Sequence, residues 1–290
     1  MKWVDEVVKI SSYSGGEQGK SGKPRLQKIH FLRAAPVNLL YFPPRMKVIV
    51  IIPAAGLGTR MAPVGKKGVP SKQFFEIHGT PVVIHTLRVF ACNRQVSQIV
   101  VALRKSEMER FRAQLEKEKL SAKVEVVEGG EHRQESVANA LSQLKAAPDD
   151  IVLVHDAVRP FVDDEIIGNV IHEVEKHGAA IAGLPAVDTI KQVERAAEGA
   201  IVTSTIPRER IVQAQTPQGF RYELIKRAFD SAVADGFSGT DEASLVERLG
   251  ESVWVVMGSA RNIKITTPAD MELAEFLIAQ AGRSTKNLAG

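Results

Sequence analysis

One stretch of the sequence, 48–72, combines small residues with fixed positive charges. An apolar run is followed by PAAGLGTRM, which contains Arg60, and the loop continues to Lys72. The small residues that directly follow the proline are Ala54, Ala55 and Gly56. With so little side chain, their backbone N–H groups are open to a phosphate or a base, and the two cations would neutralise its charge. Because the spacing fits neither the dinucleotide fingerprint nor the GxxxxGK[ST] phosphate loop, it predicts a polyphosphate site of another kind. The alternative is a tight strand-to-helix turn with charges on its surface.

A carboxylate stands at the end of a second apolar run. Asp156 lies in HDAVRP, directly after the residues 151–154. At the carboxyl end of a buried parallel strand, it could hold Mg²⁺ against nucleotide phosphates. The alternative is that Asp156 merely caps a helix.

Two further segments carry polar residues that could face a ligand. In GGEHRQES, two glycines permit close backbone approach and Ser136 could bond a base or a sugar, although the segment could also be an ordinary helix entry. In RNIK, Lys264 lies between isoleucines, which favours either a pocket or a lysine that snorkels to solvent.

The elements that must position these residues alternate between strand and helix patterns. Apolar strands are predicted at 48–52, 99–103, 124–127, 151–155 and 179–183. Helices are predicted after an N-cap at Thr80, from a capping box formed by Ser106 and Glu109, at 134–145, and at 163–177 before Gly178. Repeated βαβ units predict an α/β fold, a Rossmann-like and mostly parallel sheet with helices on both faces.

The regular alternation ends after residue 184. Two short alternating strands at 186–205, joined at Glu198 and Gly199, predict a hairpin that projects from the sheet, within an arm at about 186–210. Helices at 222–234, 241–249 and 268–279, and strands at 253–257 and 263–265, are predicted after it.

Charge and composition narrow the class of protein. The formal net charge is +4, but residues 1–45 contain eight Lys or Arg against three Asp or Glu, so the remaining chain is not basic. Nucleic acid is therefore not an expected partner. No segment reaches the roughly 18 apolar residues of a membrane span, so no membrane association is expected. Cys92 is the only cysteine, which excludes an intrachain disulfide and favours a cytoplasmic, reducing location.

The first 45 residues are polar and rich in Gly, Ser and Pro, which predicts a disordered extension before one domain at 46–290. A transit peptide, or translation from an upstream start codon before Met46, are the alternatives for this extension.

Taken in order, the motifs resemble the 2-C-methyl-D-erythritol 4-phosphate cytidylyltransferases of non-mevalonate isoprenoid biosynthesis. The similarity extends from Lys47 to about Gln280 and rests on PAAGLGTRM, KQF, GGEHRQESV, HDAVRPF, DTIK, QTPQGF, TDEAS and NIKIT. The resemblance implies transfer of CMP from CTP to methylerythritol phosphate, with release of pyrophosphate, in a homodimer. The projecting hairpin would be the dimerisation arm.

The resemblance also implies a role for each matching residue. Arg60 and Lys72 would stabilise the transition state at the α-phosphate of CTP, and Asp156 would bind Mg²⁺. Lys264 and Arg208 would position methylerythritol phosphate, with further contacts from Thr189 and Thr240; Thr189 and Arg208 would serve the partner's site. The nucleoside would be held by Ala54, Ala55, Gly56, Gly130, Glu131 and Ser136.

This chemistry agrees with the residues present. A phosphate monoester is already a nucleophile, so the transfer needs in-line positioning and cations rather than a Ser-His-Asp or cysteine apparatus. One departure concerns the loop lysine, because Ser71 separates Lys72 from the preceding proline. Lys66 and Lys67 are therefore rival candidates, although the continuation into Gln-Phe favours Lys72.

Two other functions remain open at this point. A ribitol or ribulose 5-phosphate cytidylyltransferase would share the fold and the chemistry. It more often begins with Leu-Ala-Gly-Gly and lacks the Glu-Ala-Ser that follows Thr240 and Asp241 here. A non-catalytic nucleotide-binding protein would be expected to have lost a cation or Asp156, and all of them are present.

Overall fold

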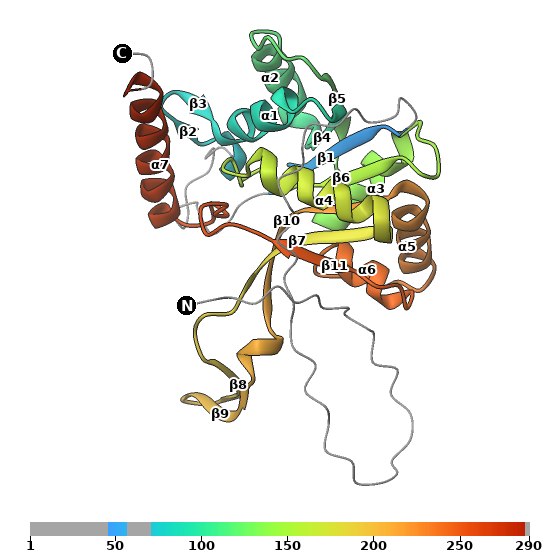
Figure 1. Cartoon of the computed structure of the whole chain (residues 1–290), viewed down its shortest axis with the longest axis vertical. Coiled ribbons are helices and arrows are strands. Elements are labelled where there is room, and N and C mark those ends of the chain that lie inside the picture. The colour runs from blue at the N-terminus through green and yellow to red at the C-terminus, as the bar shows by residue number, and fades with distance from the viewer. Residues whose placement is uncertain (1–45, 57–70, 288–290) are drawn as a thin grey trace.

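A computed structural model of the chain describes residues 46–56 and 71–287. Its centre is a single twisted sheet with helices on both sides, and a two-stranded arm extends away from this body (Figure 1). The predicted α/β class is therefore confirmed. The predicted extension, 1–45, and the loop cations Arg60, Lys66 and Lys67 lie outside the described residues.

In the described part of the chain, the central sheet has seven strands in the order β11-β7-β10-β6-β1-β4-β5. Their bounds are β1 Val48–Pro53, β4 Val96–Leu103, β5 Lys123–Glu128, β6 Ile151–Val154, β7 Ala179–Pro185, β10 Val212–Arg221 and β11 Trp254–Met257. The predicted apolar strands are all present. Strand β10 was not predicted, and it runs antiparallel between β6 and β7, whereas the other pairs in the sheet are parallel.

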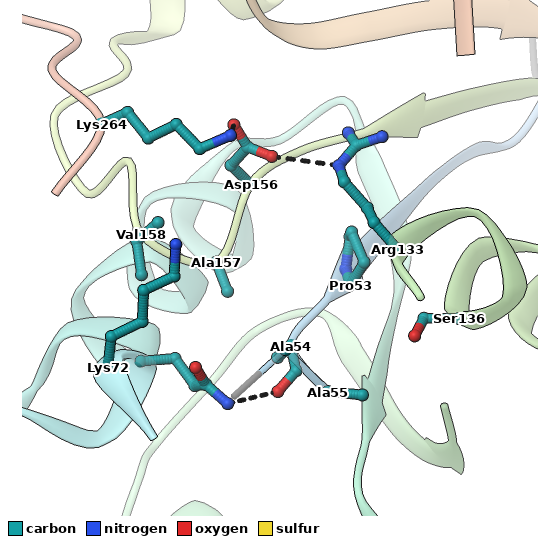
Figure 2. Close-up of a pocket in the computed structure, with 12 residues that line it drawn as sticks. Pro53, Ala54, Ala55, Lys72, Arg133, Ser136, Asp156, Ala157, Val158 and Lys264 are labelled. Carbon is teal, nitrogen blue, oxygen red and sulfur yellow. Dashed lines mark hydrogen bonds and ion pairs between the residues drawn. The ribbon is translucent and has the colours of Figure 1, made fainter. Parts of the chain in front are cut away.

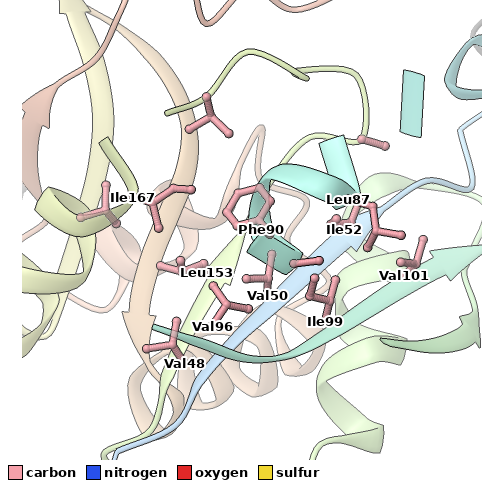
Figure 3. Close-up of a cluster of buried hydrophobic side chains, with 14 of the residues drawn as sticks. Val48, Val50, Ile52, Leu87, Phe90, Val96, Ile99, Val101, Leu153 and Ile167 are labelled. Carbon is pink, nitrogen blue, oxygen red and sulfur yellow. The ribbon is translucent and has the colours of Figure 1, made fainter. Parts of the chain in front are cut away.

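Strand β1 shows why both faces of the sheet are covered. Its side chains alternate between two buried clusters, with Val48, Val50 and Ile52 on one face and Ile49 and Ile51 on the other. The first cluster is drawn in Figure 3 and includes side chains from α1, α2 and α4. Helices α3, α5 and α6 supply the second cluster. A strand that is buried on both faces reads as a continuous apolar run, as the sequence indicated.

The helices are α1 Val82–Cys92, α2 Lys105–Leu115, α3 Arg133–Gln143, α4 Asp164–His177, α5 Tyr222–Ala234, α6 Glu242–Arg248 and α7 Pro268–Asn287, with short 3-10 turns η1 Lys72–Phe74 and η2 Arg208–Arg210. Helix α4 follows the prediction closely. Asp163 caps its first turn by accepting the N–H of Ile166 at 2.9 Å, and Gly178 ends it in the left-handed region with φ 86°.

Two predicted helix starts are wrong. Thr80 does not cap α1: it lies in the short strand β3 (Thr80–Pro81), which pairs with β2 (Glu76–Ile77), and the helix begins after Pro81. Ser106 does not form a capping box either, because α2 already starts at Lys105. At Thr80, pairing with β2 places the residue in a strand rather than at a helix start. At Ser106, the first turn of α2 has already begun, so the residue follows the cap position instead of occupying it.

The predicted hairpin is present as β8 (Ile190–Ala196) and β9 (Gly199–Ile206). Its turn consists of residues 197 and 198, one position earlier than predicted, since Ala196 pairs with Gly199. The two strands pair only with each other, and almost all their side chains are exposed. The two strands therefore do not join the central sheet, and the arm stands out from the body (Figure 1).

The predicted strand at 263–265 is wrong. These residues form an irregular segment in which the Ile265 N–H donates to the Val158 carbonyl at 2.9 Å. Ile265 packs with Ile77, Val82, Val158 and Ala274 in a small buried cluster beneath α7. The segment is thus held by burial rather than by a strand ladder.

Among the described residues, no helix has the length and apolar character needed to cross a membrane. Cys92, at the end of α1, is exposed.

Candidate active site

A cleft lies at the carboxyl edge of the sheet, where β1 and its neighbour β6 end (Figure 2). Its lining consists of Pro53, Ala54, Ala55, Gly56, Lys72, Gln73, Arg133, Ser136, Asp156, Ala157, Val158 and Lys264. The structure therefore brings together seven of the residues singled out in the sequence, from four separate segments. The seven are Ala54, Ala55, Gly56, Lys72, Ser136, Asp156 and Lys264.

Asp156 is the centre of the charges in this cleft. Its Oδ2 lies 3.0 Å from Lys264 Nζ and 3.1 Å from Arg159 Nε, and its Oδ1 lies 3.3 Å from Arg133 Nε. The Asp156 side chain is 8 % exposed, so water screens these pairs only weakly. Burial by itself would raise the pKa of Asp156, but Arg133, Lys264 and Arg159 outweigh it and hold that pKa far below its ordinary value. The group is therefore a carboxylate at every physiological pH.

A buried hydrogen-bond chain holds the backbone of Asp156. The His155 ring Nε2 lies 3.0 Å from the Arg159 carbonyl, which can only accept, so Nε2 carries the proton. Burial lowers the pKa of His155 to about 4, so at neutral pH its Nδ1 accepts from the Thr216 hydroxyl at 3.0 Å. The Thr216 oxygen in turn accepts the Asp156 N–H at 3.1 Å. His155 thus has a structural role.

Lys264 reaches Asp156 from the irregular segment after β11. Asn262 is fully buried and donates from Nδ2 to the Thr216 backbone carbonyl at 2.8 Å. The backbone carbonyl of Asn262 accepts a hydrogen bond from Arg159 Nη1 at 2.7 Å. These bonds fix the backbone two residues before Lys264. The buried Asn262 thus positions Lys264, which the predicted strand was expected to do.

Lys72 lies in η1 and faces the cleft from the side opposite Arg133 (Figure 2). Its two neighbours fasten the turn. Ser71 Oγ donates to Glu107 Oε1 at 2.5 Å, and Gln73 Nε2 donates to the Ala54 carbonyl at 2.5 Å. Ser71, the residue that separates Lys72 from the proline, is therefore one of the contacts that hold the lysine beside β1.

The predicted nucleoside loop packs tightly against the end of β1. A Cβ on Gly129 would lie 2.7 Å from the Ala55 Cβ, so only glycine permits this approach. The N–H groups of Gly130 and Glu131 are already used, by Ser136 Oγ at 3.1 Å and Glu135 Oε2 at 2.8 Å. Neither Gly130 nor Glu131 belongs to the residues that line the cleft.

Three predicted substrate residues lie outside the cleft of this chain. Thr189 and Arg208 are exposed at the base of the arm, where Arg208 Nη1 donates to the Val187 carbonyl at 2.7 Å. Thr240 is exposed in the loop before α6. The single chain does not bring these three residues to the cleft.

Arg133 was not among the residues predicted from the sequence, although it lines the cleft and joins two buried carboxylates. Its Nη1 donates to both oxygens of Glu242, at 2.6 and 2.7 Å, while Nε faces Asp156. Burial acts to lower the pKa of Arg133, but Glu242 and Asp156 raise it above the ordinary value. The available signal was its place at the first position of the helix after GGEH, at the ligand edge of the sheet.

A magnesium ion is compatible with this donor set only together with a substrate. Among the described residues, no three acidic, His or Cys side chains are grouped so that they could hold a metal ion by themselves, and Asp156 is the one acidic side chain of the cleft lining. Mg²⁺ is commonly held by one or two carboxylates, substrate phosphates and water. The ionised Asp156 meets that requirement.

Comparisons with known proteins agree on one family. Residues 48–280 match the sequence profile described as 2-C-methyl-D-erythritol 4-phosphate cytidylyltransferase. Proteins of that name from Acidobacterium capsulatum and Solibacter usitatus are 60 % and 54 % identical to this chain. The alignments cover 81 % and 83 % of this chain, and 98 % and 99 % of the two relatives. A crystal structure of 4-diphosphocytidyl-2C-methyl-D-erythritol synthase from Anaerococcus prevotii superposes with a TM-score of 0.68 at 30 % identity, covering 81 % of this chain and 99 % of that one.

Proposed function

Since the chain belongs to the 2-C-methyl-D-erythritol 4-phosphate cytidylyltransferase family, we propose that the cleft around Asp156 is where the transfer takes place. The enzyme transfers CMP from CTP to methylerythritol phosphate, and it releases pyrophosphate, in the non-mevalonate route to isoprenoids.

The observation that carries this assignment is the set of charges in the cleft. Lys264, Arg133 and Arg159 surround one buried carboxylate, and Lys72 lies across the cleft from it. Arg133, Arg159 and Lys264 outnumber the two carboxylates Asp156 and Glu242, and this leaves an excess of positive charge that a polyphosphate would neutralise. Because the excess lies next to the small residues Ala54 and Ala55, the nucleoside and the phosphates of CTP would occupy adjoining parts of the cleft.

The chemistry requires charge stabilisation and alignment. A phosphate oxygen of the acceptor attacks the α-phosphorus of CTP, and the bond to the pyrophosphate oxygen breaks. Lys72, together with Arg60 in the adjoining loop, would stabilise the charge on the α-phosphoryl oxygens. Lys264 would hold the acceptor phosphate in line, at the cost of its pair with Asp156.

Asp156 is the residue that would hold Mg²⁺. When bound, the ion neutralises charge on the triphosphate and so makes pyrophosphate a better leaving group. The residues of the cleft would still supply the alignment, because the cations come from segments that are anchored independently of the ion.

We further propose that the enzyme is a homodimer in which the arm completes the partner's site. Exposed aliphatic side chains on the arm, including Val193, Ile201 and Val202, support this proposal. Thr189 and Arg208, at the base of the arm, and Thr240 would then contact methylerythritol phosphate. The exposed thiol of Cys92 supports a reducing, cytoplasmic location.

The test supplies the purified protein with CTP, Mg²⁺ and one acceptor at a time, and measures pyrophosphate release. We expect turnover with methylerythritol phosphate and none above background with ribitol 5-phosphate or ribulose 5-phosphate. Turnover with a pentose or pentitol phosphate alone would contradict the acceptor assignment. Binding of CTP with no turnover on any acceptor would favour a non-catalytic nucleotide-binding protein.

A further inference from the structure

Glu242 is a buried carboxylate that the proposed reaction does not use. It is the first residue of α6 and is 1 % exposed. Burial raises the pKa of Glu242 above its ordinary value, and the opposing charge of Arg133 offsets only part of this rise. A carboxylate in such a place is costly unless it is paired, and both of its oxygens accept from Nη1 of Arg133.

This pairing determines how Arg133 meets Asp156. An arginine and a carboxylate favour a bidentate arrangement with two parallel N–H···O bonds. Here Glu242 holds Nη1 and so fixes the plane of the guanidinium, and Arg133 offers Asp156 only Nε, at 3.3 Å. The remaining nitrogen, Nη2, has no hydrogen-bond partner among the described residues, and the side chain lines the cleft.

Glu242 is not needed to hold its own loop. Asp241 caps α6 by accepting the Ser244 N–H at 3.0 Å, and its Oδ2 accepts from Gln218 Nε2 at 2.8 Å. The same loop is fastened to α3 through Gln134, which bonds the Phe237 carbonyl and the Gly239 N–H. The loop that carries Thr240 therefore keeps its position without the Glu242 charge.

We propose that Glu242 is a positioning residue that holds Arg133 away from a bidentate pair with Asp156 and so keeps Nη2 of Arg133 open to the phosphates of the incoming nucleotide. The inference rests on the proposed function, since it takes the cleft as the CTP site. Without the Glu242 charge, the Arg133 guanidinium closes onto Asp156. CTP must then displace a stronger ion pair before it binds.

The experiment measures the Kd of CTP in Mg²⁺ by calorimetry, alongside kcat and the KM of each substrate. Glu242→Gln is expected to raise the Kd and the KM of CTP about tenfold. The KM of methylerythritol phosphate is expected to change less than about twofold, because the Thr240 loop has its own anchors.

A double-mutant cycle with Arg133→Gln tests whether Glu242 acts through Arg133. In that background, Glu242→Gln is expected to change the Kd of CTP by less than about twofold. The matched control is Glu173→Gln, at a second buried glutamate, 2 % exposed, which lies on α4 outside the cleft. It is expected to lower the thermal midpoint and to leave the Kd of CTP unchanged.

If Glu242→Gln does not fold, Glu242→Asp keeps the charge but shortens the side chain by one methylene, and a rise of about threefold in the Kd of CTP is expected. An unchanged Kd in the folded variant, or an equal change in both Arg133 backgrounds, would overturn the proposal. The wild-type enzyme is assayed in parallel. A wild type without turnover contradicts the proposed function, whereas active enzymes with equal CTP affinity contradict only the role of Glu242.

Discussion

The cleft around Asp156 and the β8–β9 arm both extend from the carboxyl edge of the sheet, but they are built in opposite ways. In and around the cleft, Asp156, Asn262 and Glu242 are buried, and each has partners far away in the sequence. The arm pairs only with itself and leaves Val193 and Val202 half exposed, opposite each other in the ladder. The charge cluster of the cleft is assembled within one chain, whereas the arm has apolar surface that a partner could cover.

The largest effect is expected from the carboxylate itself. Asp156→Asn should lower kcat by about 100-fold or more, because three cations lose their anion and the proposed metal loses its ligand. Initial rates of pyrophosphate release at saturating CTP and acceptor would measure this.

The matched control for that change is Asp150→Asn. Asp150 is also buried, but it accepts the backbone N–H groups of Lys47 and Ala147 at the other end of β6. Asp150→Asn should lower the free energy of unfolding and leave the kcat of the folded enzyme within about threefold of the wild-type value. An equal loss of kcat in both variants would mean that the cleft is sensitive to any buried change.

The second effect concerns the loop lysine. Lys72→Ala should lower kcat by about 100-fold, since a cation next to the transferred phosphoryl group is lost. Lys66→Ala and Lys67→Ala should each lower it less than about threefold. The opposite ranking in the same assay would show that another lysine of this loop serves the α-phosphate.

A smaller effect is expected from the arm. Val193→Asp should convert the proposed dimer to a monomer, measured by light scattering after size exclusion, and should lower turnover by about tenfold. The control is Val233→Asp on α5, where an equally apolar side chain is 71 % exposed. If Val193→Asp remains dimeric and active, the arm is not the interface.

A mixing experiment sharpens the same point. Asp156→Asn and Arg208→Ala subunits, each nearly inactive alone, should regain about a quarter of wild-type activity after random exchange, because half of the dimers then contain one intact site. No recovery would mean that Arg208 serves the cleft of its own chain.

The smallest effect on turnover is expected from His155, which should change stability with pH instead. Its pKa is about 4 in the folded protein and near 6.5 when unfolded, so the unfolded state binds the extra proton between these values. The stabilisation is fully present above pH 6.5 and is lost as the pH falls toward 4, by as much as about 3 kcal/mol. Chemical denaturation at several pH values should show this slope in the wild type and a reduced slope in His155→Gln.

Features that depend on local sequence could be predicted. The apolar strands, the hairpin and both ends of α4 follow from periodicity, a cap at Asp163 and a glycine at 178. Strand β10 could not, because its centre is polar and contains Pro217. Its buried Gln218 bonds Asp241 and the Ala243 N–H, partners that no local pattern reveals.

The residues of the candidate site also differ in whether local sequence or a distant partner determines their position. Asp156 and the small residues after β1 could be found because strand ends mark the ligand edge. Arg133 could not be given a role, since its partner Glu242 is 109 residues away. Lys264 was correctly predicted as a site residue, but it was predicted to lie in a strand. The buried side chain of Asn262, rather than a strand ladder, fixes the backbone near it.

The antiparallel pairing of β7 with β10 makes the arm an insertion that could be excised. The chain leaves the sheet after Pro185 and returns at Val212, which is its pairing partner, and the Ala186 N–H already donates to the Ile211 carbonyl at 3.0 Å. A tight turn could therefore replace everything between Ala186 and Ile211 without altering the order of the strands. The order of the strands therefore sets no limit on the length of the arm, whereas Thr189 and Arg208 at its base tie it to the proposed site of the partner.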